Sequence, residues 1–238
     1  MFFIAQPSLL SGNANGIARG GRVHLSHDGV HWTPSVAATG PLGDRNTFFY
    51  NPFRQRWVFC IKTTARGSGR AKQYREHVNF LAAAQWEKGE PVFWVGADTL
   101  DLPDPAVGAP PQIYDLDVVP YESLLLGMFQ VHKGPANPIA QKNRVPKMTD
   151  LNIGFTRDGF HWQRPVRTPF IAATRQPGNW ERAYLHSVGG VLLVVGDRLF
   201  IYYSGLSGVA PKGPDMYAGG STGVAFLRRD GFASMDAD

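Results

Sequence analysis

Three aspartates occupy positions from which carboxyl groups could carry out acid–base chemistry. Asp44 precedes one apolar run, and Asp115 and Asp117 open another. When the segments 44–51 and 115–122 are aligned at their turns, Asp44 falls over Asp115. Cleavage of a glycosidic bond needs two such carboxyl groups, one to protonate the leaving oxygen and one to attack the anomeric carbon or to activate water. Aspartate also caps turns that enter strands, so residue chemistry alone leaves both roles open.

A short repeated motif predicts the elements that would position these acids. Ser-His-Asp-Gly-Val-His-Trp at 26–32 returns as Thr-Arg-Asp-Gly-Phe-His-Trp at 156–162, and a shorter copy occupies 228–232. A weaker copy ends at Trp86, after the run 78–84, which reads as a strand. Asp-Gly makes a tight turn that tolerates positive φ, and the following Trp can fold back over the preceding strand. Copies 54, 76 and 72 residues apart suit four-stranded propeller blades with long loops.

The segments between these turns predict β hairpins. Two apolar runs joined by a polar turn occur three times, at 47–50 with 57–61, 118–119 with 124–129, and 190–195 with 199–203. Because the runs are continuous rather than alternating, we expect strands covered on both faces, as in stacked blades; a β-sandwich is the competing fold. Residues 71–88 are weakly helix-compatible, and we predict strand plus loop there.

The composition supports one all-β domain over residues 1–238. The 27 Gly, 18 Pro and 18% charged residues exclude coiled coils and helical bundles, and the 12% aromatic content excludes disorder. The single Cys60 excludes a disulfide framework and a thiolate zinc site. No apolar run reaches the ~18 residues of a membrane span, and the opening residues 1–5 are too short for a signal peptide. Compartment and oligomeric state are not predicted.

The net charge of +5 raises the question of nucleic-acid binding. Nucleic-acid binders concentrate basic residues on one face or helix, whereas the basic residues here are scattered. The densest group is Arg66, Arg70, Lys72 and Arg75 in a glycine-containing segment. We predict a solvated loop there and no nucleic-acid partner.

The segment around Asp44 resembles a known family. The segment is similar to the Arg-Asp-Pro strand of five-bladed-propeller glycoside hydrolases, through Asp44, Phe48 four residues later and the run 57–59. These enzymes form the invertase, levansucrase and arabinanase-like superfamily of families 32 and 43. The order here is Gly43-Asp44-Arg45, with no Pro following. Through the repeat and the hairpin register the resemblance covers nearly all of the chain. It implies a five-bladed β-propeller of four-stranded blades, in which Asp44 holds the sugar and stabilises the transition state.

The resemblance also implies a general acid at the start of the inner strand of the next blade. The family usually has Glu there, in Glu-Cys-Pro or Glu-Gly-Pro, whereas the matching position here is Asp115 within Tyr-Asp-Leu-Asp, and Asp117 is equally admissible. A first blade supplies the family's nucleophile or base, and residues 1–4 read like a later strand of that blade. A closed ring at this spacing needs roughly 300 residues. We therefore expect about four blades, the first incomplete.

Four further residues are candidates for substrate binding. Arg45 and Tyr114 adjoin the candidate acids, and His186 lies just before the third hairpin. Glu122 is included because the family acid is a Glu, although a turn role or a salt bridge competes at its hairpin position. His132 follows the second hairpin and is less persuasive.

No metal or cofactor site is predicted. No His pair has the i,i+4 spacing of a zinc hydrolase. Asp98, Asp101 and Asp104 recur every three residues, but they lack the Gly and the Glu of an EF-hand, so we predict a solvated loop. The Pro-containing loops 97–112 and 133–149 are long enough to be functional or mobile.

Aromatic residues offer surfaces for sugar rings. Trp57, Trp94 and Trp180 are the stacking candidates, because the C–H faces of sugars pack on aromatic rings. The Asp-Gly-x-x-Trp turns resemble the sialidase Asp box, which is a structural device, and we expect His31 and His161 within them to be structural too.

These observations predict a glycoside hydrolase-like protein that acts on a carbohydrate by carboxylate chemistry. The alternative is a non-catalytic propeller that binds carbohydrate or protein. The two readings differ in geometry: an enzyme brings its carboxyl groups to one place, roughly 5 to 10 Å apart, whereas turn-capping acids point apart.

Overall fold

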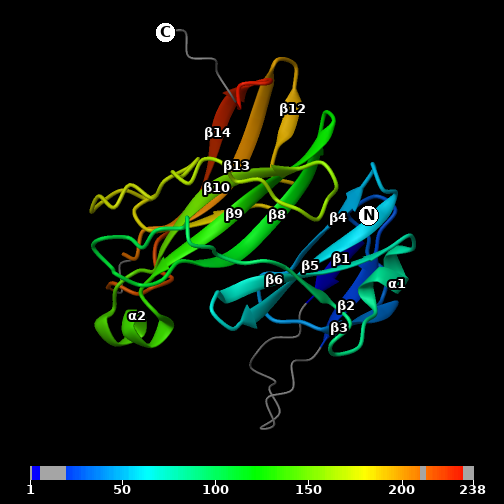
Figure 1. Ribbon diagram of the computed structural model, residues 1–238, viewed down its shortest axis with the longest axis horizontal. Coiled ribbons are helices and arrows are strands. Elements are labelled where there is room, and N and C mark those ends of the chain that lie inside the picture. The colour runs from blue at the N-terminus through cyan, green and yellow to red at the C-terminus, as the bar shows by residue number, and fades with distance from the viewer. Residues whose placement is uncertain (1, 6–19, 210–212, 233–238) are drawn as a thin grey trace.

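The computed structural model describes residues 2–5, 20–209 and 213–232, and it is mostly β (Figure 1). The all-β expectation is confirmed. Three sheets make up the described chain: a small sheet of three strands, a sheet of four, and a large sheet of seven. In Figure 1 the two smaller sheets, blue and cyan, lie beside the large one, which runs from green to red.

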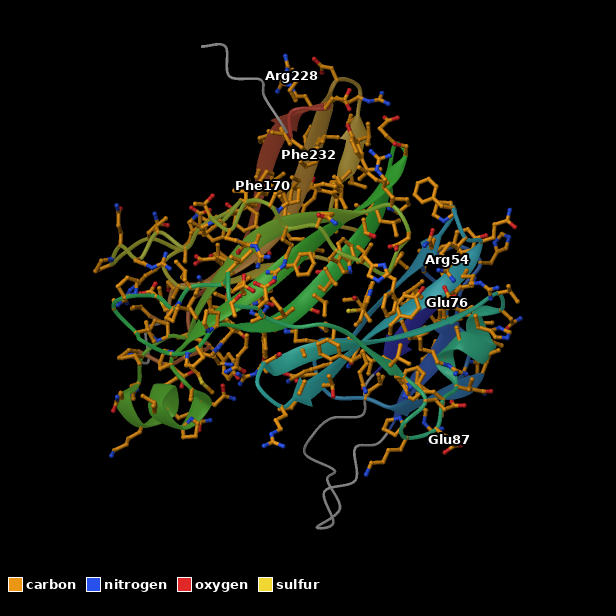
Figure 2. The ribbon with its side chains drawn as sticks, in the orientation of Figure 1. Arg54, Glu76, Glu87, Phe170, Arg228 and Phe232 are labelled. Atoms are coloured by element: carbon orange, nitrogen blue, oxygen red, sulfur yellow. The ribbon has the colours of Figure 1, made fainter. Side chains whose placement is uncertain are left out.

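The four-stranded sheet has the form expected of a single blade. It is an antiparallel meander of β4 (Thr47–Asn51), β5 (Arg56–Ala65), β6 (Gly69–His77) and β7 (Val92–Val95). The predicted first hairpin is confirmed, since Phe49 pairs with Val58. An ion pair of 2.6 Å between Arg54 in its turn and Glu76 on β6 ties the turn to the next strand (Figure 2).

A short helix follows β6, where the sequence predicted a strand over 78–84. Helix α1 (Phe80–Ala84) begins after Asn79, whose side chain accepts a hydrogen bond of 3.0 Å from the amide of Ala82. That contact is an N-cap, and alanine is the best helix former, so local preferences favour one helical turn here. The ring of Phe80 then packs 5.1 Å from that of Trp57.

The large sheet joins two segments that the sequence analysis assigned to separate blades. Its order is β12-β13-β11-β10-β9-β8, with β14 also pairing with β13, and it curls like half a barrel. Strands β10 and β11 pair in parallel where Thr149 lies opposite Tyr184. A complete ring of five four-stranded blades is therefore not seen in the described residues. The strands are β8 (Gln112–Tyr121), β9 (Leu124–Gly134), β10 (Met148–Thr156), β11 (Tyr184–Ser187), β12 (Leu193–Val195), β13 (Arg198–Leu206) and β14 (Gly220–Arg228).

The remaining elements are the small sheet and a second helix. The small sheet consists of β1 (Phe2–Ala5), β2 (Gly20–Leu25) and β3 (Ala37–Pro41). Helix α2 (Asn137–Asn143) lies within the segment 133–149, which the sequence predicted as a loop. Its Pro stands in the first turn, a position that tolerates proline because the first amides of a helix have no internal partner.

Both faces of the central strands are buried, as the continuous apolar runs predicted. Strand β9 is buried at nearly every position, and the second and third hairpins form as expected between β8 and β9 and between β12 and β13. The expectation is wrong for the third hairpin: all three residues of β12 are exposed, and β13 alternates between buried and more exposed positions. Phe170 and Phe232 cover part of the large sheet, with ring centroids 6.1 Å apart (Figure 2).

The Asp-Gly motif forms the predicted turn. Asp28 accepts hydrogen bonds from the amides of Val30 and His31, at 2.9 and 2.8 Å, and the copy at 156–162 repeats this pattern. Trp162 folds back onto Phe129, with ring centroids 5.2 Å apart, as expected. Trp32 remains 38% exposed, so of the two Asp-Gly-x-x-Trp copies the second confirms the predicted packing of the Trp.

Candidate functional site

A cluster of charged side chains surrounds the ring of Tyr114 on β8. The Tyr114 hydroxyl donates a hydrogen bond of 2.9 Å to Asp44, which also forms an ion pair with Lys62 on β5. Four cations lie within 6 Å of the Tyr114 ring centroid: Lys62 at 5.1 Å, Arg70 at 5.2 Å, Lys147 at 5.3 Å and Arg45 at 5.9 Å. We refer to Asp44, Arg45, Lys62, Arg70, Tyr114 and Lys147 as the Tyr114 cluster.

A buried lysine fixes the loop that carries Asp44 and Arg45. Lys72 on β6 is 0% exposed, and its ammonium donates to the Arg45 carbonyl at 2.5 Å and to the Asp115 carboxylate at 2.8 Å. Burial alone would lower the pKa of Lys72, but the adjacent Asp115 carboxylate outweighs it and raises that pKa. Arg45 itself has a φ of 57°, an unusual conformation for a long side chain, and this hydrogen bond helps to hold it. Lys72 therefore links Asp115 to the loop of Asp44.

Asp117 lies two residues further along β8, on the same face as Asp115. It is buried, and Ser187 on β11 donates a hydrogen bond to it. Burial, and then repulsion from Asp115, raise the pKa of Asp117 to about 7. A carboxyl group that keeps its proton near neutral pH has the property required of a general acid.

His186 brings β11 into contact with the cluster. Arg45 donates to its Nε2 at 3.1 Å. Burial, and then repulsion from Arg45 and Lys147, lower the pKa of His186 to about 3, so the ring is neutral at ordinary pH. A neutral imidazole can accept the Arg45 hydrogen bond.

Lys147 at the entry to β10 is a buried cation among three tyrosines. Its side chain is 0% exposed, and its ammonium lies 4.8 Å from the ring centroids of both Tyr184 and Tyr217, in addition to that of Tyr114. It also donates to the Tyr217 hydroxyl at 3.1 Å. Burial, and then repulsion from Arg70, lower the pKa of Lys147 to about 8.

His132 on β9 lies beside the cluster, with its ring centroid 6.0 Å from that of Tyr114. It is buried, and within the described chain neither ring nitrogen has a hydrogen-bond partner. Burial, and then repulsion from Arg70 and Lys147, lower the pKa of His132 to about 3. The ring therefore adds polar but uncharged atoms to the site.

Most of the residues that the sequence singled out lie in this region. The structure brings together Asp44, Arg45, Tyr114, Asp115, Asp117 and His186. Glu122 is not among them. It stands in the hairpin turn with a φ of 49°, pairs with Arg229 at 2.8 Å, and lies about 20 Å along β8 from Asp115.

Several residues of the site were missed. Arg70 and Lys72 were predicted to lie in a solvated loop, which is wrong because β6 covers Gly69–His77. Lys72 is buried next to the buried Ala71, and the sequence of this strand has no apolar alternation that could have identified it. The other missed residues are Lys62, Lys147, Tyr184 and Tyr217. His132 was considered the less persuasive histidine, but it lies beside Tyr114.

The aspartates of the segment 97–112 form ion pairs instead of a solvated loop. Asp101 and Asp104 are buried; Arg164 binds Asp101 through two hydrogen bonds, of 2.7 and 2.9 Å, and Arg175 binds Asp104 at 2.8 Å. Within the described ranges, no group of three or more His, Cys, Asp or Glu side chains could hold a metal ion.

The three tryptophans proposed for sugar stacking lie elsewhere and pack against other aromatic rings. Trp57 contacts Phe80, Trp94 contacts Tyr74 at 5.0 Å, and Trp180 stacks on Tyr203 at 5.5 Å. The aromatic surfaces of the site are tyrosines instead, and Tyr217 among them is half exposed.

Comparisons with solved structures give a likeness of fold. An N-acetylgalactosamine deacetylase from F. plautii, solved in complex with blood group B trisaccharide, has a TM-score of 0.56 at 17% identity, covering 90% of this chain. This chain spans 65% of that protein's length. Two other structures are more distant. A glycoside hydrolase has a TM-score of 0.45 at 11% identity, covering 76% of this chain and 45% of its own. A glycosyl hydrolase from Bacteroides ovatus has a TM-score of 0.38 at 13% identity, covering 71% of this chain and 49% of its own.

No family model and no curated protein sequence matches this chain. The likeness to the deacetylase is one of fold. In the described part of the chain, no helix is long and apolar enough to cross a membrane.

Proposed function

We propose that this protein hydrolyses a glycosidic bond by attack of water at the anomeric carbon, with Asp117 as the general acid that protonates the leaving oxygen and Asp44 as the carboxylate that holds the sugar and stabilises the transition state. The observation that carries the proposal is the meeting of Asp44, Asp115 and Asp117 around Tyr114 and Lys72. The four-stranded sheet and the curled large sheet would then be parts of a propeller of the five-bladed type.

The two candidate acids differ in environment, and this difference favours Asp117. Asp115 is held by the ammonium of Lys72, a contact that stabilises a carboxylate. Asp117 has no cationic side chain in hydrogen-bond contact among the described residues, and burial raises its pKa to about 7. Asp117 can therefore donate a proton to a leaving oxygen. Asp115 contributes because its negative charge disfavours the ionisation of Asp117.

Asp44 suits the stabilising role. Although partial burial would raise the pKa of Asp44, the hydrogen bond and the charge of Lys62 lower it below its ordinary value. An ionised carboxylate with an exposed edge can stabilise the positive charge of an oxocarbenium-like transition state.

A non-catalytic carbohydrate-binding protein is the second candidate, and the burial of Asp115 and Asp117, 4% and 2% exposed, is the observation that favours it. A screen against furanoside and pyranoside substrates, with reducing ends measured, separates the two. We expect Asp117→Asn and Asp44→Asn each to lower kcat by about 10²- to 10⁴-fold. Glycan binding without turnover by the unmodified protein would favour the second candidate, and unchanged turnover in both variants would refute these assignments.

A further inference from the structure

The charges of the Tyr114 cluster do not balance among the described residues. Of its four cations, Lys62 pairs with Asp44. Lys72, which lies outside the cluster, pairs with Asp115 at 2.8 Å. The other three cations, Arg45, Arg70 and Lys147, have no carboxylate within ion-pair distance in the described chain. Their contacts are neutral: His186 for Arg45, Gln112 and Asn137 for Arg70, and Tyr217 for Lys147.

This excess of positive charge is unfavourable as it stands. Arg70 and Lys147 both lie within 5.3 Å of one ring centroid, and Lys147 is fully buried. Repulsion between these cations contributes to the low pKa of Lys147 and of His132 beside them. A buried or crowded charge is costly unless an opposite charge compensates it. An anion placed among the three cations would supply that compensation.

We propose that the Tyr114 cluster binds the negatively charged group of an acidic sugar, a carboxylate or a sulfate ester. The inference rests on the proposed carbohydrate function and specifies its substrate class. Each guanidinium of Arg45 and Arg70 retains N–H groups beyond those already bonded, and such groups bind carboxylate and sulfate oxygens in pairs. Lys147 adds a point charge, and the half-exposed ring of Tyr217 offers a face for the sugar.

The position of this anion site suits the proposed chemistry. Tyr114, at its centre, is hydrogen-bonded to Asp44 and precedes Asp115 and Asp117 on β8 by one and three residues. An acidic sugar anchored by the three cations would therefore place a neighbouring glycosidic bond close to the candidate carboxyl groups. The same cations would weaken the binding of substrates that carry positive charge.

Binding measurements on the whole protein test the proposal with matched pairs of ligands. Oligogalacturonates are compared with the same oligomers after methyl esterification, and sulfated galacto-oligosaccharides with their desulfated forms. Calorimetry gives each Kd at low and at high NaCl. We expect at least one acidic ligand to bind about tenfold or more tightly than its neutral counterpart, with an affinity that falls as salt rises.

Variants locate the anion site. Arg70→Gln and Lys147→Gln are each expected to weaken binding of the acidic ligand by about tenfold to a hundredfold, because each removes a charged hydrogen-bond donor. Lys133→Gln is the matched control. Lys133 is a cation on β9 that donates to the Leu102 carbonyl, and it lies on the face of the strand opposite His132. Arg70 is half-buried, so its variant carries the test if Lys147→Gln fails to fold.

The outcomes separate this inference from the proposed function. Equal binding of esterified and free-acid oligomers, or of sulfated and desulfated ones, overturns the acidic-sugar inference and leaves carbohydrate hydrolysis in place. Acidic oligomers that bind through Arg70 and Lys147 without being cleaved support the inference and refute hydrolysis. Failure of every oligosaccharide to bind, including a case where inorganic sulfate alone binds, overturns both.

Discussion

Replacing Lys72 with methionine tests whether the ion pair beneath the site holds it together. Lys72 is 0% exposed, and Asp115 beside it is 4% exposed. Methionine keeps the length and apolar stem of lysine but leaves the Asp115 carboxylate buried without its cation. Removing one partner of a buried pair costs about 3–5 kcal/mol, because the remaining charge is uncompensated. We expect a loss of that size for Lys72→Met, and a similar loss for Asp115→Asn.

The double variant Lys72→Met with Asp115→Asn should recover most of this loss. It removes both charges, and replacing a whole buried pair is often close to neutral. The hydrogen bond from Lys72 to the Arg45 carbonyl stays lost, which costs about 1–2 kcal/mol. We therefore expect the free energy of unfolding of the double variant to be about 1–2 kcal/mol lower than that of the unmodified protein. This loss is much smaller than the sum of the losses in the two single variants.

Urea unfolding, followed by tryptophan fluorescence, gives the free energy of unfolding of the unmodified protein, the two single variants and the double variant at the same pH. The coupling energy from this cycle should be at least about 4 kcal/mol, the sum of the single losses less that of the double variant. Single losses that simply add in the double variant, or a loss below about 1 kcal/mol for Lys72→Met, would refute the view that this pair is a tightly coupled unit.

Three further outcomes follow from the structure. Burial raises the pKa of Asp117 from an ordinary 3.8 to about 7, so the free-energy cost of burying its charge is fully present above pH 7 and fades towards pH 4. Asp117→Asn should therefore raise the free energy of unfolding in urea at pH 8, and raise it less at pH 5. Gly127→Ala should lower the free energy of unfolding by about 1–3 kcal/mol, because a Cβ would lie 2.6 Å from the Trp162 ring. Gly189→Ala, whose Cβ would have no atom within 4 Å, should change it by less than about 0.5 kcal/mol. The affinity for an acidic sugar should fall as pH rises through about 8, where Lys147 loses its charge, and a flat pH profile from 7 to 9 would contradict that role.

The sequence predicted the local structure well where short-range chemistry decides it. The polar turn between 47–50 and 57–61 and the Asp-Gly turn at 156–162 depend on neighbouring residues, and both form as expected. The segment 78–84 was predicted wrongly, because an N-cap at Asn79 outweighs its apolar, strand-like character.

The candidate site was predicted in part, through the hairpin register that aligned Asp44 with Asp115. The cations around them were not predicted, because their significance depends on partners distant in the sequence. Arg70 and Lys147 look like ordinary surface residues until β6 and β10 are folded beside Tyr114. The continuous large sheet was missed for the same reason, since a single parallel pairing at Thr149 and Tyr184 leaves no local signature.

The contact between Arg45 and His186 spans 141 residues of the chain and joins the loop before the four-stranded sheet to a strand of the large one. Neither sheet alone contains the site, so the site is complete only when the two sheets are docked. Contacts of such long sequence separation form late, because the chain must first lose the entropy of closing the intervening loop. A ligand held by Arg70 on β6 and by Lys147 at the entry to β10 would therefore act as a non-covalent cross-link between the two sheets.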